Sequence, residues 1–277
     1  MADRLAVAAT APFGAYVLEG LAARREIAFL VTRPDRPAGR GRKLRPPAAK
    51  LVAERLGIPV LQPEKLDAAP SGDVQLDADI VVLAAYGVLI PEAQLERALW
   101  LNVHPSLLPR WRGAAPVERA LMAGDAETGV TIHETVKELD TGPIAAQAAF
   151  PLTLEDDAGS VYEKTAALAV TLLDGVLPEP AFQPQSEEGA CYAAKIAPED
   201  RELDWNRPPE ESLNRIRALS PHIGAWGELD GRRLIVWRAR PAGPDSALVV
   251  GGLELLEVQP EGKKRMAAAD YLRGLRQ

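Results

Sequence analysis

Short apolar runs alternate with helical stretches through the first half of the chain, and this alternation constrains the fold more than any other feature. Several runs lack the polar–apolar alternation of a half-exposed sheet, which indicates strands that are covered on both faces. Strands that alternate with helices predict right-handed crossovers and a doubly wound parallel sheet, an α/β fold. The expected strands are Leu5–Ala9, Ile27–Val31, Pro59–Leu61, Asp79–Ala84 and Leu101–Val103, and the expected helices are Ala15–Arg24, Ala48–Leu56 and Glu92–Ala98.

The pattern changes after residue 128. Two further strands, Gly129–Val136 and Ile144–Phe150, are expected around a turn at residues 139–142. A helix is expected from Gly159 to about Leu177, with a capping box at residues 160–163.

Four prolines between residues 178 and 200 predict a linker, and short strands separated by glycine turns follow it. These strands indicate a small antiparallel β-barrel of the OB-like kind. They are Trp226–Leu229, Arg233–Ala239, Ala247–Val250 and Leu253–Val258, followed by a helix at Ala267–Leu275. The predicted domains are therefore residues 1–184, a linker at 185–203, and a C-terminal barrel at 204–277.

Composition and missing motifs narrow the function. The single cysteine, Cys191, excludes an intramolecular disulfide and a cysteine-cluster metal site, and it fits the reducing cytoplasm. No apolar run approaches the roughly 20 residues that span a bilayer, and no signal peptide is evident. The dinucleotide, P-loop and nucleophile-elbow glycine motifs are absent, and the three histidines lack zinc-ligand spacing.

A basic segment interrupts an acidic chain. The net charge is −7, yet residues 33–50 hold seven Lys or Arg residues against one Asp. The segment is rich in Pro and Gly, which disfavours helix and strand and predicts a mobile loop. A charge run is most often a solvated face, but a patch of this density can also meet a polyanion.

The densest chemical motif begins at Asn102. Asn102 and His104 are two residues apart on a predicted strand, so their side chains share a face at its carboxyl end. An Asn amide can donate to a carbonyl oxygen, and a His titrates near neutral pH. Asp140, in the later turn, is the best-placed carboxylate to orient the imidazole, and it should raise the pKa of His104.

Structural roles compete with these assignments. A lone Asn or His in a loop is usually structural, and His133 and His222 are assigned such a role. Ser106 could simply cap the following turn, and Trp111 could be a packing residue.

The run from Asn102 to Pro109 resembles the signature of the 10-formyltetrahydrofolate-dependent formyltransferases. Residues 34–44, 106–116, 124–132 and 139–142 are similar to the methionyl-tRNA formyltransferase branch of that family, and residues 79–91 resemble its folate-pocket strand and loop. The resemblance spans nearly the whole chain. It implies transfer of the formyl group of 10-formyltetrahydrofolate, a co-substrate, to the α-amine of initiator methionyl-tRNA through a tetrahedral intermediate, without a metal.

The resemblance also implies roles for individual residues. Asn102 and His104 would supply donors to the oxyanion, and Asp140 would hold His104 charged and assist proton transfer. The implied folate-contacting residues are Ser106, Leu107, Leu108, Pro109, Tyr86, Gly87, Val88 and Leu89. The implied tRNA-contacting residues are Arg36, Arg40, Arg42, Lys43, Lys263 and Lys264. No membrane contact and no obligate protein partner are expected.

Two other functions stay open at this point. One is formyl transfer to a glycinamide ribonucleotide or an amino sugar nucleotide, which would use the same three residues without needing a basic loop. The other is a non-enzymatic tRNA-binding protein built on a decayed enzyme, against which the intact Asn102, His104 and Asp140 speak.

Overall fold

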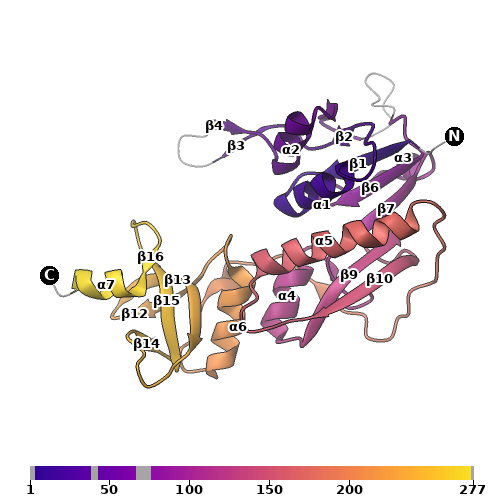
Figure 1. Cartoon of the computed structure of the whole chain (residues 1–277). Helices are drawn as coiled ribbons and strands as arrows, with labels where there is room; N and C mark the ends of the chain where they lie inside the picture. Colours follow the sequence, from indigo (N-terminus) through magenta and orange to yellow (C-terminus); the bar gives the residue numbers. More distant parts are fainter. Residues whose placement is uncertain (1–3, 39–42, 67–75, 276–277) are drawn as a thin grey trace. The chain divides into compact units, whose positions relative to one another are not determined.

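The computed structural model describes residues 4–38, 43–66 and 76–275 and divides into two compact units (Figure 1). The first unit comprises Met1–Arg112, Gly129–Ala149 and Glu163–Cys191, and the second comprises Gly113–Thr128, Phe150–Tyr162 and Tyr192–Gln277. Each unit is made of three separate segments of the chain, so the contiguous domains predicted with boundaries at residues 184 and 203 stay a prediction. Among the described residues, no helix is both long and apolar enough to cross a bilayer.

The first unit is built on the predicted parallel sheet. Its seven strands have the order β10-β9-β7-β6-β1-β2-β5. The strands from β7 to β5 are parallel, and β9 runs antiparallel to β7. Their bounds are β1 (Leu5–Ala9), β2 (Leu30–Val31), β5 (Val60–Leu61), β6 (Ile80–Ala84), β7 (Leu99–His104), β9 (Glu127–Glu134) and β10 (Ile144–Pro151). The doubly wound α/β prediction is confirmed.

Both faces of the central strands are buried. Ala6 and Ala8 of β1 belong to one apolar cluster, while Val7 and Ala9 point to the opposite face and are also fully buried. The helices that accompany this sheet are α1 (Pro12–Ala22), α2 (Ala48–Leu56), α3 (Glu92–Leu95) and α5 (Ala158–Val176). Helix α1 packs closely on α5, since a Cβ added at Gly20 would lie 2.6 Å from a methyl group of Val170.

The predicted capping box of α5 is wrong in its position. The structure places the box at Asp157 and Ser160: the Ser160 N–H donates to Asp157 Oδ1 at 2.9 Å, and the Asp157 N–H donates to Ser160 Oγ at 3.1 Å. A short acceptor before the first helical residue satisfies one of the open N–H groups there. Helix α5 accordingly begins at Ala158 rather than Gly159.

The basic segment is more structured than its composition predicted. Strands β3 (Arg36–Ala38) and β4 (Lys43–Arg45) form an antiparallel pair, and α2 follows at Ala48. The hairpin base is fixed by Lys50, whose ammonium lies 2.9 Å from Asp35. Hydrogen bonds from Gln62 and Lys50 lower the pKa of Asp35.

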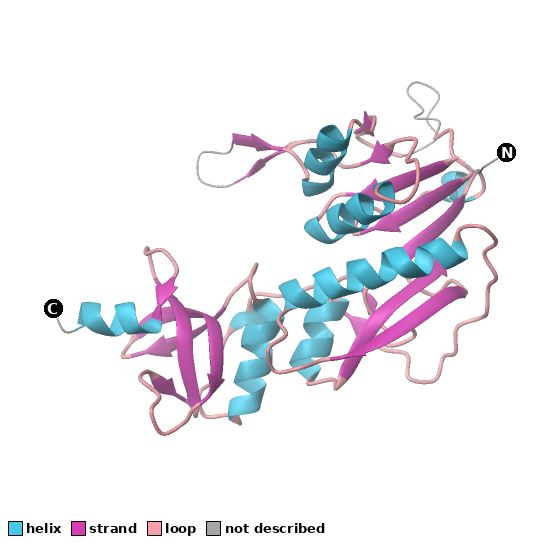
Figure 2. Cartoon of the chain, viewed as in Figure 1, coloured by secondary structure: helices cyan, strands magenta, loops and turns pink. Residues whose placement is uncertain are grey.

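The second unit carries a five-stranded antiparallel sheet, with helix α6 (Pro209–Leu219) beside it (Figure 2). Sequence patterning located the strands between residues 225 and 260 but missed a short strand at Met266–Ala267. It also missed α6 and α4 (Pro116–Ala123), each of which starts with a proline in its first turn. The strands are β12 (Ala225–Leu229), β13 (Arg232–Pro241), β14 (Val249–Val250), β15 (Leu253–Pro260) and β16 (Met266–Ala267), and α7 (Ala268–Leu275) follows. A short pair joins β8 (Arg112–Gly113) to β11 (Tyr192–Ala193), and a 3₁₀ turn spans Glu199–Arg201.

Candidate active site

Strand pairing brings the first two candidate side chains together with a third. Asn102 and His104 lie on β7, two residues apart, as the sequence predicts. Strand β9 pairs antiparallel to β7 with His133 directly opposite Asn102. Residues directly opposite in an antiparallel pair present their side chains on the same face. The register therefore adds His133 to the cluster, although sequence analysis assigned it only a structural role.

Asp140 reaches the same cluster from the turn between β9 and β10. Its backbone has φ of 54°, in the left-handed region that Asp tolerates better than most residues. The turn packs tightly on the end of β9, because a Cβ added at Gly142 would lie 1.9 Å from the Glu134 carbonyl oxygen. The Asp140 side chain is thereby buried, with 7% of its surface exposed.

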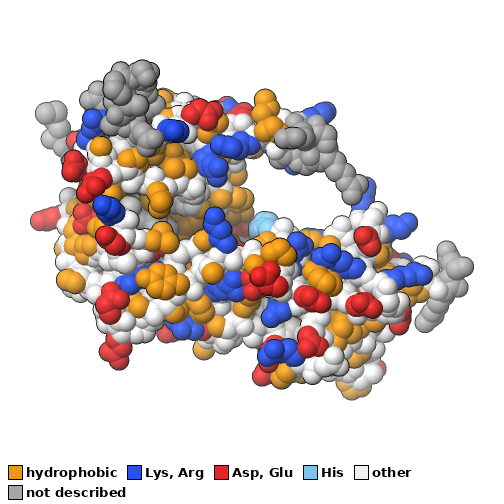
Figure 3. Space-filling model, turned by 180° about the vertical axis from the view of Figure 1, so that it is seen from behind, with side chains coloured by type: hydrophobic (Ala, Val, Ile, Leu, Met, Phe, Trp, Pro, Cys, Tyr) orange, Lys and Arg blue, Asp and Glu red, His pale blue; other side chains and the backbone are white. Residues whose placement is uncertain are grey.

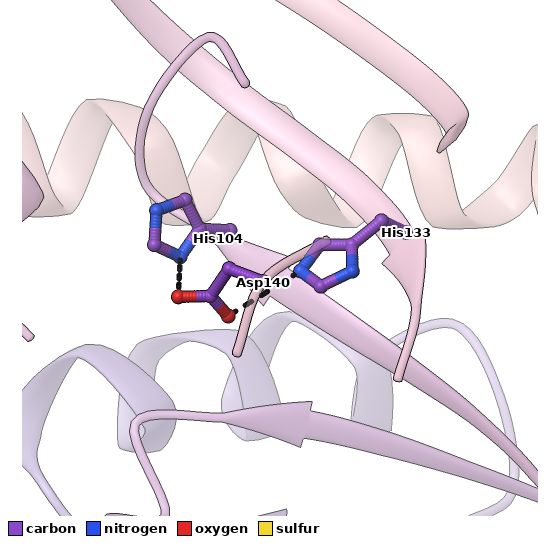
Figure 4. A group of neighbouring side chains, drawn as sticks. All are labelled: His104, His133 and Asp140. Atoms are coloured by element: carbon purple, nitrogen blue, oxygen red, sulfur yellow. Dashed lines mark ion pairs between the residues drawn. The ribbon is translucent and has the colours of Figure 1, made fainter. Parts of the chain in front are cut away.

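The Asp140 carboxylate lies between two imidazoles, as Figure 4 shows. Its Oδ2 is 3.6 Å from His104 Nδ1, and its Oδ1 is 3.7 Å from His133 Nε2. Asn102 Nδ2 donates to the same Oδ1 at 3.1 Å. The structure therefore brings together all three residues that the sequence proposed as catalytic.

Hydrogen bonds fix the orientation of the Asn102 amide. His133 Nδ1 lies 2.8 Å from the Glu134 carbonyl oxygen, which can only accept, so Nδ1 carries the proton and Nε2 of the neutral ring accepts. Asn102 Nδ2 donates to that Nε2 at 3.1 Å and to Asp140. Both amide hydrogens are thus engaged. The predicted donation from Asn102 to an oxyanion stays a prediction, and it requires one of these bonds to be exchanged for substrate.

His104 is held in one tautomer by the loop that follows it. Its Nε2 lies 2.8 Å from the Trp111 carbonyl oxygen, so the neutral ring carries its proton there and presents Nδ1 to Asp140 as an acceptor. Trp111 thus contributes its backbone to the site.

Burial lowers the pKa of His104 below its ordinary value, and the Asp140 carboxylate only partly offsets this effect. The expected rise is therefore wrong in direction. The His104 side chain is 5% exposed, while the 3.6 Å separation exceeds a normal hydrogen-bond length, so desolvation outweighs the attraction. His104 is consequently neutral at neutral pH.

The same three residues could in principle hold a cation. One ligand atom from each of His104, His133 and Asp140 lies within 4.8 Å of the others. The Asn102 amide, however, donates into this group at His133 and Asp140, and an N–H donor opposes a cation at the same place. The donor set fits a hydrogen-bonded acid–base cluster better than a metal centre.

Comparison with known proteins identifies the family. The Formyl transferase model matches residues 4–177, and the Formyl transferase, C-terminal domain model matches residues 195–251. The methionyl-tRNA formyltransferase of Paracoccus denitrificans is 42% identical over 96% of this chain and 95% of its own length. The chain belongs to the methionyl-tRNA formyltransferase family. The methionyl-tRNA formyltransferase of Thiobacillus denitrificans, 41% identical over 98% of this chain and 96% of its own, agrees.

Solved structures share the fold of this family. HypX from Aquifex aeolicus in complex with tetrahydrofolic acid matches with a TM-score of 0.67 and 18% identity over 98% of this chain. The chain spans 47% of that HypX chain. An N-formyltransferase from Helicobacter canadensis, solved with folinic acid and dTDP-3-aminofucose, matches with a TM-score of 0.64 and 16% identity, over 96% of this chain and 99% of its own.

In the loop expected to contact folate, residues 106–109, some side chains are buried and others are accessible. Ser106 is fully buried and its hydroxyl donates to the Arg110 carbonyl at 2.7 Å, which matches the alternative interpretation of Ser106 as a turn cap. Leu108 is buried, whereas Leu107 and Pro109 are partly exposed. Leu107 and Pro109 are therefore the loop side chains available to a ligand.

Two residues that the sequence did not single out fix this loop. Thr131 Oγ1 donates to the Ser106 carbonyl at 2.7 Å and accepts from the Leu108 N–H at 3.1 Å. Gln147 Nε2 donates to the Leu108 carbonyl at 2.9 Å and to Thr131 Oγ1 at 2.7 Å. They lie on β9 and β10, so only the strand register could have revealed them.

The residues after β6 form the second expected folate-contacting segment. Tyr86 is buried, and burial raises its pKa. Gly87, Val88 and Leu89 are exposed, and Gly87 has φ of 76°, a conformation that favours glycine. The apolar side chains of Val88 and Leu89, together with exposed backbone at Gly87, suit contact with a flat ligand.

The expected tRNA-contacting residues are exposed wherever the structure describes them. Arg36 and Lys43 lie on the β3–β4 hairpin, and Lys263 and Lys264 lie between β15 and β16. Arg40 and Arg42 lie outside the described residues. Figure 3 shows Lys and Arg side chains intermingled with Asp and Glu on the face that it draws. Among the described residues of this face, the cations therefore do not form one continuous positive patch.

Proposed function

We propose that this chain transfers the formyl group of 10-formyltetrahydrofolate to the α-amine of initiator methionyl-tRNA, in the cytoplasm. The observation that carries the proposal is the buried cluster at the end of β7, in which a neutral His104 presents Nδ1 to the Asp140 carboxylate. The family relatives with this activity support the choice of substrates.

The reaction needs one proton to change place. The amine nitrogen forms a bond to the formyl carbon, the bond from that carbon to the folate nitrogen breaks, and a proton passes from the amine to the leaving nitrogen. His104 Nδ1 is the base that takes this proton, since Nε2–H is held by Trp111. The imidazolium formed is stabilised by Asp140 and returns the proton to the leaving nitrogen.

The remaining residues orient the reactants. Asn102 aligns Asp140 through its amide and contributes a donor to the oxyanion when the substrate replaces one of its partners. The exposed cations of the β3–β4 hairpin and of the turn after β15 bind the tRNA phosphates. The apolar contacts to the folate come from Leu107, Pro109, Val88 and Leu89.

A substrate-exchange assay tests this function. Purified enzyme with 10-formyltetrahydrofolate is offered methionylated initiator tRNA, glycinamide ribonucleotide or an amino sugar nucleotide, and kcat/KM is measured for each. Formylation of the tRNA alone is expected. Comparable formylation of either small acceptor without activity on the tRNA would contradict the proposal, and no transfer to any acceptor would indicate a binding protein.

A further inference from the structure

The turn that carries Asp140 is held by a side chain 45 positions further along the chain. Gln185 Nε2 donates to the backbone carbonyls of Asp140 at 2.9 Å and Gly142 at 2.6 Å. The two bonds match the two amide hydrogens and bridge the turn on either side of Thr141. A residue at positive φ persists where its surroundings fix it, so these bonds hold the backbone that aims the carboxylate.

Arg112 determines which way the Gln185 amide points. Its Nε and Nη2 donate to Gln185 Oε1 at 3.2 and 3.0 Å, and its Nη1 and Nη2 donate to the Glu187 carboxylate at 3.2 and 3.1 Å. The Arg112 side chain is only 2% exposed. A guanidinium can only donate, so Oε1 must face Arg112 and Nε2 must face the turn.

Adjacent residues thereby hold both members of the His104–Asp140 pair. The Trp111 carbonyl accepts from His104 Nε2, and the next residue, Arg112, fixes Gln185 against the Asp140 turn. The separation between His104 Nδ1 and Asp140 Oδ2 therefore depends on the backbone at Trp111 and Arg112. Trp111 holds His104 directly, and Arg112 holds the Asp140 turn through Gln185. Residue 185 was expected to begin a linker, so sequence analysis assigned it no part in the site.

We propose that Gln185 is a positioning residue for formyl transfer, which acts by holding the Asp140 turn in register with His104. The proposal rests on the proposed function, in which that pair moves the proton. Gln185 contacts the backbone of the turn rather than a reacting group, so its loss should lower turnover without weakening the binding of either substrate.

Two substitutions distinguish the contact of Gln185 with Arg112 from its contact with the Asp140 turn. Gln185→Glu keeps an acceptor for Arg112 and replaces the donor to the turn, whereas Gln185→Leu removes both. Gln183→Glu is the matched control. Gln183 lies two residues from Gln185 and is exposed, and its replacement by Glu introduces the same charge as Gln185→Glu. The measurements are kcat, KM for methionyl-tRNA and for 10-formyltetrahydrofolate, the NMR titration midpoint of His104, and the melting temperature.

The expected result is a fall in kcat of about 10- to 100-fold in both Gln185 variants, with each KM changed by less than about threefold. In Gln185→Leu the His104 midpoint should fall, because the Asp140 carboxylate that favours its charged form moves away. Gln183→Glu should match the wild type. If Gln185→Leu does not fold, the turnover of Gln185→Glu decides the proposal.

Two results would overturn the proposal. One is a kcat for Gln185→Glu within about twofold of the wild type, well short of the expected loss. The other is a loss of kcat with a lower melting temperature and an unmoved His104 midpoint, which would mean that Gln185 acts only on stability. Full activity in Asp140→Asn is a different outcome, because it would refute the proposed function of the pair whatever Gln185 does.

Discussion

The cluster around Asp140 and the β3–β4 hairpin place their charges in opposite ways. Asp140 is buried and meets an imidazole on each side, with an amide donor between them. On the hairpin, Arg36 lies directly opposite Arg45, and both are exposed. Like charges opposite each other destabilise a strand pair. The cluster is thus preorganised for chemistry without a ligand, whereas the hairpin holds charges that a polyanion would stabilise.

The largest effect on turnover should follow from substituting His104 or Asp140. We expect Asp140→Asn and His104→Gln each to lower kcat by about 100- to 1000-fold, the loss typical for one preorganised catalytic group. Dissociation constants for tetrahydrofolate, measured by calorimetry, should stay near the wild-type value. Near-normal turnover under chemistry-limited conditions in either variant would remove that residue from the mechanism.

A smaller effect should follow from removing the support behind Asn102. In His133→Leu the Asn102 amide loses one acceptor, so its orientation is less fixed and a partly buried donor is left without that partner. We expect kcat to fall about 10-fold and the free energy of unfolding to fall by about 1–3 kcal/mol. Denaturant melts and initial rates measure the two quantities.

The control for this variant is His222→Leu, since His222 is exposed. It should leave both quantities unchanged. A His133→Leu enzyme with wild-type turnover would return His133 to the purely structural role that the sequence suggested.

The hairpin should respond in binding rather than in turnover. Arg36→Ala or Lys43→Ala should reduce the slope of tRNA affinity against salt concentration by about one unit for each phosphate that is no longer neutralised. The free energy of unfolding should change by less than about 0.5 kcal/mol, because both side chains are exposed. Arg55→Ala is the control, since Arg55 already pairs with Glu19 at 2.9 Å. An unchanged salt slope would exclude the hairpin from phosphate binding.

The smallest expected effect is on the pH dependence of the free energy of unfolding. The pKa of folded His104 lies below its ordinary value, so between these values the unfolded chain binds more protons than the folded one. Stability should therefore rise with pH through this window and fall as the solution is acidified below about pH 6.5. Denaturant melts of the wild type and His104→Gln should differ in this slope, and parallel curves would contradict the burial effect.

The sequence predicted the elements whose signal is local. Strand β1 and helix α2 have the predicted bounds, since an unbroken apolar run and an amphipathic stretch between proline and glycine are complete in themselves. Helix α4 was missed because it is only eight residues long and begins with Pro116, three residues after Gly113, in a stretch whose glycine and proline suggest a turn. The β3–β4 hairpin was missed because its proline and glycine content suggested a loop.

The grouping of Asn102, His104 and Asp140 was predicted because these residues share a strand end and a neighbouring turn. His133 and Gln185 were not, for a different reason. His133 joins the site through the register of β9 on β7, and Gln185 through the path of a proline-rich segment. Neither the register of two strands nor the path of an irregular segment can be predicted from the local sequence pattern. The direction of the His104 pKa also depended on burial, which a motif does not report.

In the proposed mechanism, His104 is a buried neutral base whose charged form is favoured by Asp140. The direct measurement is an NMR titration of the His104 ring protons in the wild type and in Asp140→Asn. We predict a wild-type midpoint below the ordinary histidine value of about 6.5, and a lower midpoint in Asp140→Asn, where desolvation acts without the carboxylate. A wild-type midpoint above the ordinary value, or one that Asp140→Asn leaves unmoved, would contradict the claim.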